Sequence, residues 1–318
     1  MSDTIVKMDK ASEWAKATLK AGPAKLQNQF ADNVDWFDVE SPSKSFDANQ
    51  DKCRYYNVPV PDNARIALVE RSTGHDFYHA SRVPMRGDPD LRIIAAQGPL
   101  RNTVADFWHL IMQQRVGVVV QLCSYEDKHH NGYAHLDCAR YWPSGEGAEL
   151  SVDEFTVKTD KEELIDDKKG LQLRTLTVSQ KKGDTTTHHT LHHIYVASWP
   201  DYGVPDTVDP IVATDTPLLA HCLAGIGRTC TLLASLIAVR ALVRPEGVVK
   251  NPETLLQNTI QEIRASRPGA VQTSSQYIYA HACVLKRLAE MELILDDEEL
   301  EKFPYMLHKD RKRKITTV

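Results

Sequence analysis

The sequence predicts an α/β domain, because two strongly apolar strands and a long apolar helix occur in a chain of ordinary globular composition. Residues 116–123 (VGVVVQLC) and 217–222 (PLLAHC) are apolar on both faces, which is typical of strands at the centre of a covered sheet. A glycine-containing turn follows the second strand and leads into an apolar helix expected over 229–243. A single large domain is compatible with the length of 318 residues.

The first third of the chain predicts helices, a polar loop and short strands. Apolar residues at helical spacing indicate a helix over 11–34, interrupted at Gly22-Pro23. A polar, turn-rich loop is expected over 38–52. Strands are expected within 64–70 (ARIALVE) and 92–97 (RIIAAQ), and 104–114 (VADFWHLIMQQ) predicts a helix.

The second half predicts a hairpin and two more helices. The segments 171–179 and 190–199 flank the turn KKGD and should pair as antiparallel strands. Asn251 as helix cap and Pro252 at the first helical position predict a helix that runs to about Ala265. A further helix is expected from about Ser274 to Leu295.

These elements suggest one main domain with two appendages. We expect residues 1–50 to form a helical segment that packs on the main domain, and residues 51–295 to form that domain. Residues 296–318 read as a tail that is first acidic (DDEELE) and then basic (KDRKRK).

Charge and cysteine usage limit the location and the partners. The chain has 38 Lys and Arg against 43 Asp and Glu, a net charge of −5, which gives no case for nucleic acid as a partner. The six cysteines are scattered without a CxxC pair, as expected of reduced thiols in the cytoplasm or, alternatively, the nucleus. Neither a signal peptide nor an apolar run long enough for stable membrane insertion is evident.

The most informative segment is HCLAGIGRT, residues 221–229, between the second apolar strand and the long helix. Gly225 and Gly227 allow the backbone N–H groups to point inward, and the helix adds its own N-terminal donors. This arrangement would bind a phosphate group and favour the thiolate form of Cys222, while Arg228 could hold two phosphate oxygens. The plain alternative is a buried structural cysteine beside a strand-to-helix turn. The combination Cys-x5-Arg-Thr with two glycines in this context favours a phosphate loop, residues 222–228.

A thiolate that attacks phosphorus needs an acid to protonate the departing oxygen. Trp199-Pro200-Asp201-Tyr202-Gly203 supplies an aspartate on a loop that could close over a substrate and exclude water. Taken alone, such a segment is a common turn. Because Asp201 lies 21 residues before Cys222, we interpret it as the general acid.

With these two motifs the sequence resembles the protein tyrosine phosphatases of the cysteine-dependent family. The similarity extends over about residues 12–290 and includes several further segments. The matching segments are Lys52-Cys53-Arg54-Tyr55, Asp76-Phe77-Tyr78-His79-Ala80-Ser81, Gln97-Gly98-Pro99-Leu100, Asp106-Phe107-Trp108, Cys138-Ala139-Arg140-Tyr141-Trp142-Pro143 and the stretch from Arg264 to Tyr277.

The resemblance implies a twisted mixed β-sheet flanked by helices, with the phosphate loop between a central strand and a buried helix. It implies hydrolysis of phosphotyrosine in proteins through a cysteinyl-phosphate intermediate, without a metal or another cofactor. Cys222 would be the nucleophile, Arg228 the phosphate clamp and Asp201 the acid. Residues Leu223, Ala224, Gly225, Ile226 and Gly227 would bind the phosphate through their backbone.

The same resemblance implies roles for residues outside the loop. Thr229 would assist release of the thiolate, and Gln272 and Gln276 would place the attacking water. Tyr55 would form the wall of a slot too deep for phosphoserine, and Glu126 would orient Arg228. Two more residues, His221 and Trp199, are expected to support the site.

Among the departures from the family pattern, two bear on the function. Asn57 occupies the position of an aspartate that usually anchors the substrate backbone, and the segment 205–217 is about a dozen residues short. They leave open an alternative function, a weakly active pseudophosphatase that binds phosphotyrosine. Loss of Cys222, Arg228 or Asp201 would mark such a protein, and all three are present.

Three further features have ordinary interpretations. His188, His189, His192 and His193 fall within a predicted strand, and ordinary strand residues are favoured over a zinc site. The basic residues 311–314 are interpreted as solvated rather than as a nuclear or lipid-binding signal. The C-terminal Thr316-Thr317-Val318 resembles a ligand of PDZ domains, a weak indication of such a partner.

Overall fold

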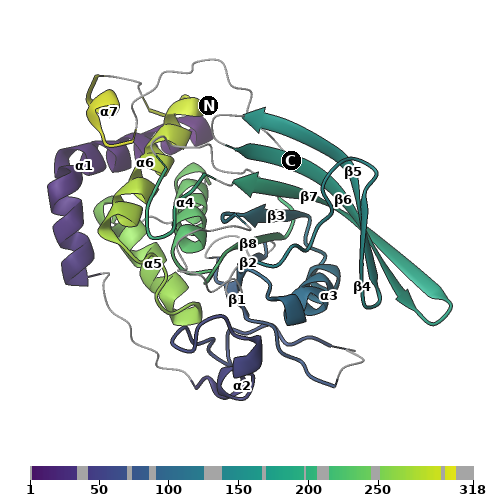
Figure 1. Ribbon diagram of the computed structural model, residues 1–318. Helices are drawn as coiled ribbons and strands as arrows, with labels where there is room; N and C mark the ends of the chain where they lie inside the picture. The colour runs from purple at the N-terminus through teal and green to yellow at the C-terminus, as the bar shows by residue number, and fades with distance from the viewer. Residues whose placement is uncertain are drawn as a thin grey trace.

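A computed structural model describes ten ranges of the chain: 2–33, 42–69, 74–85, 91–124, 138–166, 170–196, 198–205, 215–244, 251–294 and 298–305. Figure 1 shows a strongly twisted sheet with helices packed against it. The strands are β1 Ala80–Val83, β2 Ile93–Gln97, β3 Val118–Gln121, β4 Glu149–Val152, β5 Phe155–Asp166, β6 Leu171–Lys182, β7 Thr185–Val196 and β8 Leu218–Cys222. The α-helices are α1 Ser2–Asn33, α2 Lys44–Asp47, α3 Val104–Gln114, α4 Arg228–Val243, α5 Leu255–Ser266, α6 Ser274–Glu290 and α7 Glu298–Lys302.

The strands form one mixed sheet in the order β1-β2-β8-β3-β7-β6-β5-β4. The four strands β2, β8, β3 and β7 are parallel to one another, and the outer pairs are antiparallel. Every residue of β2, β3 and β8 is buried. The predicted fold class, a twisted mixed sheet flanked by helices, is therefore confirmed, and so is the central position of the two apolar strands.

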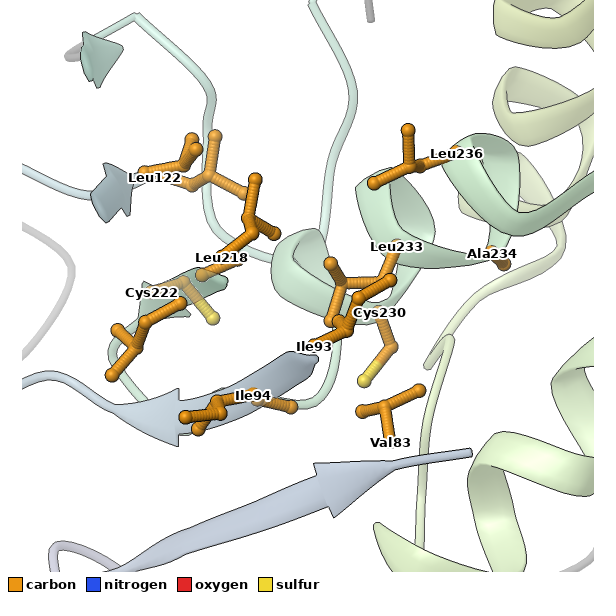
Figure 2. Packing of buried hydrophobic residues seen from close by; sticks show 14 of the residues in the cluster. Val83, Ile93, Ile94, Leu122, Leu218, Cys222, Cys230, Leu233, Ala234 and Leu236 are labelled. Atoms are coloured by element: carbon orange, nitrogen blue, oxygen red, sulfur yellow. The ribbon is translucent and has the colours of Figure 1, made fainter. Parts of the chain in front are cut away.

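Helices cover both faces of the central strands. Successive strand residues point to opposite faces, so Leu218 and Cys222 of β8 share one face and His221 lies on the other. Figure 2 shows Leu218 and Cys222 on the side of α4, near Leu233 of that helix. On the opposite face, the ring of His221 packs edge-on against Phe107 of α3, with 5.7 Å between the ring centroids.

The N-terminal helix α1 packs along α6, beside α4 and α5 (Figure 1). Trp14 stacks on His281 at 5.9 Å, and Tyr277 donates a hydrogen bond to Gln29 at 2.8 Å. The predicted interruption of this helix is confirmed, because Gly22 has φ 67° and ψ 171° and Pro23 follows it. Since α1 buries its apolar face against α6, it is held by tertiary contacts rather than by helix propensity.

Near the other end of the chain, α7 returns to α6. Leu300 and Phe303 are buried, and the Tyr305 ring contacts Tyr279 at 5.4 Å. The first part of the region expected to be a tail therefore packs against the domain. The basic residues 309–314 and the C-terminal PDZ-like tripeptide lie outside the described residues.

Most predicted elements have the expected positions, including the helices over 104–114 and 229–243 and the hairpin of β6 and β7. The expected loop over 38–52 contains the short helix α2 and a 3-10 turn, Gln50–Lys52. The helix expected to reach Leu295 ends at Glu290, because Glu292 adopts a left-handed conformation with φ 58°.

The prediction of a strand within 64–70 was wrong. The described residues of this segment, 64–69, form no strand and make only one isolated β-bridge, between Arg65 and Ser81. A side chain, rather than a neighbouring strand, forms hydrogen bonds with part of this backbone. Gln113 of α3 accepts a hydrogen bond from the Val69 N–H at 2.9 Å and donates one to the Ala67 carbonyl at 2.9 Å. The backbone groups are thus satisfied without a ladder.

Candidate active site

The parallel core of the sheet brings the two predicted motifs together. Strands β7, β3 and β8 are adjacent and parallel, so their carboxyl ends lie at one edge. The phosphate loop begins at the end of β8, and the Asp201 segment follows the end of β7. This edge is where open α/β sheets bind ligands.

The shape of the phosphate loop is fixed from outside through its carbonyl groups. Four consecutive carbonyls, those of residues 223 to 226, all accept hydrogen bonds from neighbouring segments. The donors are Gly98 N for Leu223 O at 2.9 Å, Arg267 Nη2 for Ala224 O at 2.7 Å, Arg267 Nε for Gly225 O at 3.1 Å and Val271 N for Ile226 O at 3.0 Å. With the carbonyls held outward, the N–H groups of the loop are free to face its interior.

Two glycines make this loop conformation accessible. Gly225 has φ 73°, and a Cβ there would overlap the carbonyl oxygen of Ala96 on β2. A Cβ on Gly227 would overlap the side-chain oxygen of Gln272. The loop therefore approaches β2 and the Gln272 segment as closely as only glycine permits.

Cys222 lies within the loop. Its Sγ accepts a hydrogen bond from the Gly225 N–H at 3.3 Å, and the side chain is buried. This backbone donor faces the sulfur, and the N-terminus of α4 begins at the end of the same loop. The sulfur therefore lies inside a loop that is suited to bind an anion.

Arg228, the first residue of α4, reaches the Asp201 segment. Its Nη1 donates to the carbonyl of Trp199 at 3.0 Å, and its Nη2 forms an ion pair with Asp201 Oδ1 at 2.9 Å. The guanidinium is fully buried, whereas the Asp201 side chain keeps 14% of its surface exposed. Arg228 is thereby held at the junction between the two motifs.

The Asp201 segment is anchored at both ends. Trp199 is buried, donates from Nε1 to the Gly203 carbonyl at 3.0 Å and packs edge-on against Tyr279 of α6 at 5.1 Å. Tyr202, with φ 56°, accepts a hydrogen bond through its carbonyl from the Thr273 hydroxyl at 3.4 Å. These contacts connect the segment to the start of α6.

Tyr55 borders the site from a segment outside the sheet. Burial raises the pKa of its phenol, and Asp201, Tyr202 and Cys222 are near enough to add to that shift through their negative charge. The half-buried ring thus lies near Cys222 and Asp201. Asn57 is exposed.

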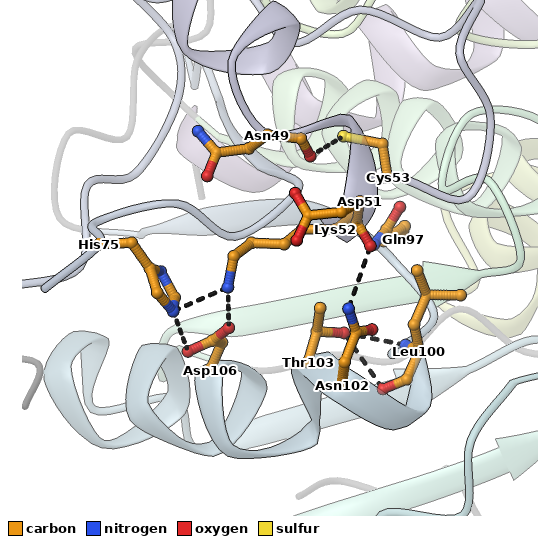
Figure 3. A network of polar contacts seen from close by, with 10 residues as sticks. All are labelled: Asn49, Asp51, Lys52, Cys53, His75, Gln97, Leu100, Asn102, Thr103 and Asp106. Atoms are coloured by element: carbon orange, nitrogen blue, oxygen red, sulfur yellow. Dashed lines mark hydrogen bonds and ion pairs between the residues drawn. The ribbon is translucent and has the colours of Figure 1, made fainter. Parts of the chain in front are cut away.

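The segment before Tyr55 is fixed by polar contacts with β2 and α3 (Figure 3). Gln97 donates to the carbonyl of Lys52 at 2.7 Å, and Asn102 donates to that of Asp51 at 3.0 Å. The Lys52 ammonium lies 3.3 Å from the buried carboxylate of Asp106. This anchoring sets the position of the tyrosine ring.

Two glutamines and a threonine surround the other side of the loop. Gln276 accepts a hydrogen bond from the Gln272 N–H at 2.9 Å, and its Nε2 would lie 3.1 Å from a Cβ on Gly227. That Nε2 and the Thr229 hydroxyl are buried and form no hydrogen bond within the described ranges. Both groups are therefore available to a bound molecule.

Sequence reasoning named Arg267 and His79 within motifs but gave them no role. Arg267 is fully buried and donates to the loop carbonyls and, from Nη2, to His79 Nδ1 at 3.0 Å. His79 Nε2 lies 2.8 Å from the carbonyl of Val58, so a neutral ring can donate there and accept from Arg267. Burial lowers the pKa of Arg267 to about 10, and it lowers the pKa of His79 well below its usual range. Only the tertiary contacts reveal that these residues hold the loop.

Of the other predicted residues, His221 is buried behind the loop and lies 2.7 Å from the Tyr141 hydroxyl. Glu126 lies outside the described residues, as does most of the shortened segment 205–217. The four histidines of the predicted strand lie in β7 on alternating faces.

The family model described as "Protein-tyrosine phosphatase" matches residues 49–286. This chain belongs to the protein-tyrosine phosphatase family. It is 33% identical over 250 residues to mouse tyrosine-protein phosphatase non-receptor type 18, covering 74% of this chain and 51% of the relative. It is 31% identical over 253 residues to human receptor-type tyrosine-protein phosphatase eta, covering 74% of this chain and 17% of that protein.

A solved structure of the family agrees with the fold. The crystal structure of the catalytic domain of human protein tyrosine phosphatase non-receptor type 18 superposes with a TM-score of 0.65 at 28% identity, covering 85% of this chain and 94% of that domain. The chain spans about a sixth of the eta receptor and about half of the mouse relative. The matched portion contains all the residues assembled at the sheet edge described above.

Proposed function

We propose that this chain hydrolyses phosphotyrosine in proteins. The observation that carries the proposal is the convergence of Cys222, Arg228 and Asp201 at one sheet edge, around a loop in which the carbonyl groups of residues 223–226 are held by donors from neighbouring segments. The family membership supports the same reaction. Residues 51–295 would form the catalytic domain, with residues 1–50 as a supporting helical segment.

In the first step the Cys222 thiolate attacks phosphorus and displaces the tyrosine oxygen, which takes a proton from Asp201. The negative charge on the phosphoryl oxygens is met by the inward N–H groups and by Arg228, which are in place before the reaction. Dephosphorylated tyrosine leaves and a cysteinyl-phosphate remains. No metal or cofactor enters this scheme.

In the second step water attacks the cysteinyl-phosphate. Gln272 and Gln276 would position the water, and Asp201, now ionised, would accept its proton. Thr229 would stabilise the departing Cys222 thiolate through its hydroxyl. Inorganic phosphate and the free thiolate are the products.

The ion pair between Asp201 and Arg228 shapes the cycle. The carboxylate forms an ion pair with the guanidinium that would bind the phosphate, so the substrate would compete with Asp201 for Arg228. Once displaced, Asp201 is beside a dianionic phosphate, whose negative charge favours the protonated acid. Substrate binding would thereby favour the protonated form of Asp201, which is the form that donates the proton.

Specificity for phosphotyrosine would come from the depth of the site. Tyr55 would form the wall of a slot above Cys222, whose side chain is almost entirely buried. A phosphoserine side chain is shorter than phosphotyrosine by an aromatic ring and would not reach the sulfur. Trp199 and His221 would act as supporting residues, and Asn57 is exposed where it could face a substrate peptide.

The pseudophosphatase alternative receives no specific support from the described residues. The nucleophile, the clamp and the acid are all retained and lie together. Among the described helices, none combines the length and the apolar character needed to cross a membrane. We propose a cytoplasmic, or alternatively nuclear, enzyme in signalling; the PDZ-type partner remains a weaker prediction.

The proposal is tested with a phosphotyrosine peptide and a matched phosphoserine peptide, using wild-type protein and Cys222→Ser. We expect release of phosphate from the phosphotyrosine peptide by wild type alone, and binding of that peptide by both proteins. Binding without any turnover by wild type would identify a pseudophosphatase. Equal turnover of both peptides would contradict the deep slot.

A further inference from the structure

A compact group of two thiols and an imidazole lies behind the phosphate loop. The Sγ atoms of Cys123 and Cys138 and a ring nitrogen of His221 all lie within 4.8 Å of one another. The three side chains are almost entirely buried, with exposed fractions of 0%, 3% and 0%. They come from the end of β3, from the segment before Tyr141 and from β8, so the sheet itself assembles them.

The imidazole is oriented by a neighbour. His221 Nε2 lies 2.7 Å from the Tyr141 hydroxyl, which also lies 3.0 Å from His193 Nε2. Nδ1 lies 3.2 Å from the Cys222 carbonyl, to which it can donate; in a metal-bound state the ring proton would instead be on Nε2 and be donated to Tyr141, which leaves the Nδ1 lone pair for the metal. Nδ1 is also on the side of Cys138: a Cβ built on Gly98 would lie 3.4 Å from Nδ1 and 3.1 Å from Cys138 Sγ.

The Cys123 thiol lacks the features of a reactive cysteine. Burial raises the pKa of Cys123 well above its usual range, and the neighbouring Cys138 raises it further, whereas His221 partly lowers it. A neutral buried thiol is a poor nucleophile toward peroxides. A metal ion would instead replace the two thiol protons and compensate the charge of the thiolates.

We propose that Cys123, Cys138 and His221 form a binding site for a thiophilic d10 metal ion, with Zn²⁺ as the physiological candidate. Two thiolates and one imidazole are the donors that select zinc and Cu⁺ over Mg²⁺ or Ca²⁺. A hydrogen bond from the second imidazole nitrogen to Tyr141 is the outer contact that commonly orients a histidine ligand.

The proposed metal site does not include the groups that would react, but it adjoins the phosphate loop. His221 immediately precedes Cys222, and its Nδ1 lies 3.2 Å from the Cys222 carbonyl. Ligation through Nδ1 would remove that contact at the start of the phosphate loop. A bound metal is therefore positioned to influence the loop without touching the phosphate.

The experiment uses full-length Cys222→Ser, which removes the catalytic thiol as a competing metal ligand. The protein is purified from medium supplemented with Zn²⁺, or incubated with Zn²⁺, Cu⁺ or the spectroscopic probe Cd²⁺, and then desalted. Metal content per chain and the ultraviolet thiolate-to-cadmium absorption are measured. The matched control is Cys222→Ser/Cys283→Ser, which removes another buried cysteine outside the cluster.

We expect one metal ion per chain in Cys222→Ser and in the Cys283 control, with two protons released on binding. Adding Cys123→Ser should weaken binding about tenfold or more, and so should Tyr141→Phe, which leaves all three ligands in place. Preferential retention of Cu⁺ would identify the ion while supporting the site. Absence of bound metal in folded Cys222→Ser, or equal binding by Cys222→Ser/Cys123→Ser, would overturn the proposal.

Discussion

Asp201 Oδ1 and Arg228 Nη2 lie 2.9 Å apart, so that the proposed acid and the proposed phosphate clamp are bound to each other. The pair connects the segment after β7 with the first residue of α4. A bound phosphate and Asp201 would therefore compete for the Arg228 guanidinium. The predictions below begin with this pair.

Asp201→Asn should lower turnover of a phosphotyrosine peptide by about 10²–10⁴-fold, because general acid catalysis is lost. Vanadate should bind at least as tightly as to wild type, since no carboxylate then competes for Arg228. Steady-state kinetics and vanadate titration check both points. Asp215→Asn, which removes the exposed pair between Asp215 and Arg240, is the control and should change neither. Unchanged turnover in Asp201→Asn would show that another group donates the proton.

Cys222 should be alkylated by iodoacetate well below pH 8, and vanadate should protect it, because the loop donors favour its thiolate. Cys230 is a useful comparison within the same protein, since burial raises its pKa to about 12. Mass spectrometry of the labelled peptides gives the two rates. Gly225→Ala should abolish the difference, because a Cβ there collides with Ala96. Equal rates for the two cysteines in wild type would mean that the loop is not formed.

His79→Ala should destabilise the protein by roughly 1–3 kcal/mol, because Arg267 loses a buried acceptor of its charged hydrogen bond. The rate should also fall, since Arg267 positions the carbonyls of Ala224 and Gly225. His79→Asn, which can still accept through its amide oxygen, should recover part of both losses. Urea unfolding and kcat/KM are the measurements. A loss of stability with no change in kcat/KM would remove His79 from the support of the loop.

The protein should lose stability as the pH falls below about 6.5, because buried histidines must charge on acidification. Burial lowers the pKa of His281 to about 4, so the unfolded state binds more protons between these values. The loss from this residue alone is about 3 kcal/mol at most by pH 4. His281→Phe keeps an aromatic ring against Trp14 and should flatten the pH dependence of unfolding. His188→Gln, at an exposed position, should leave it unchanged.

Sequence alone was sufficient to predict the local structure at the candidate site. Cys222, Arg228 and the two glycines of the phosphate loop are close in the chain, and their spacing between an apolar strand and an apolar helix specifies a loop with inward N–H groups. The same holds for the helix break at Gly22 and for the cap at Asn251, whose side chain accepts from the Glu253 N–H at 3.0 Å. Short-range geometry decides such features.

The tertiary structure decided which distant residues meet. Asp201 reaches Arg228 because β7 and β8 are parallel, with β3 between them, an order that no local pattern encodes. The segment 64–70 has the composition of a strand, yet Gln113 of α3 satisfies its backbone instead. Arg267 holds the loop 42 residues away in the chain, and Cys123, Cys138 and His221 meet only because three segments are packed at the back of the same sheet. Burial and pairing across the sheet are long-range effects, and they set the contacts that the sequence leaves open.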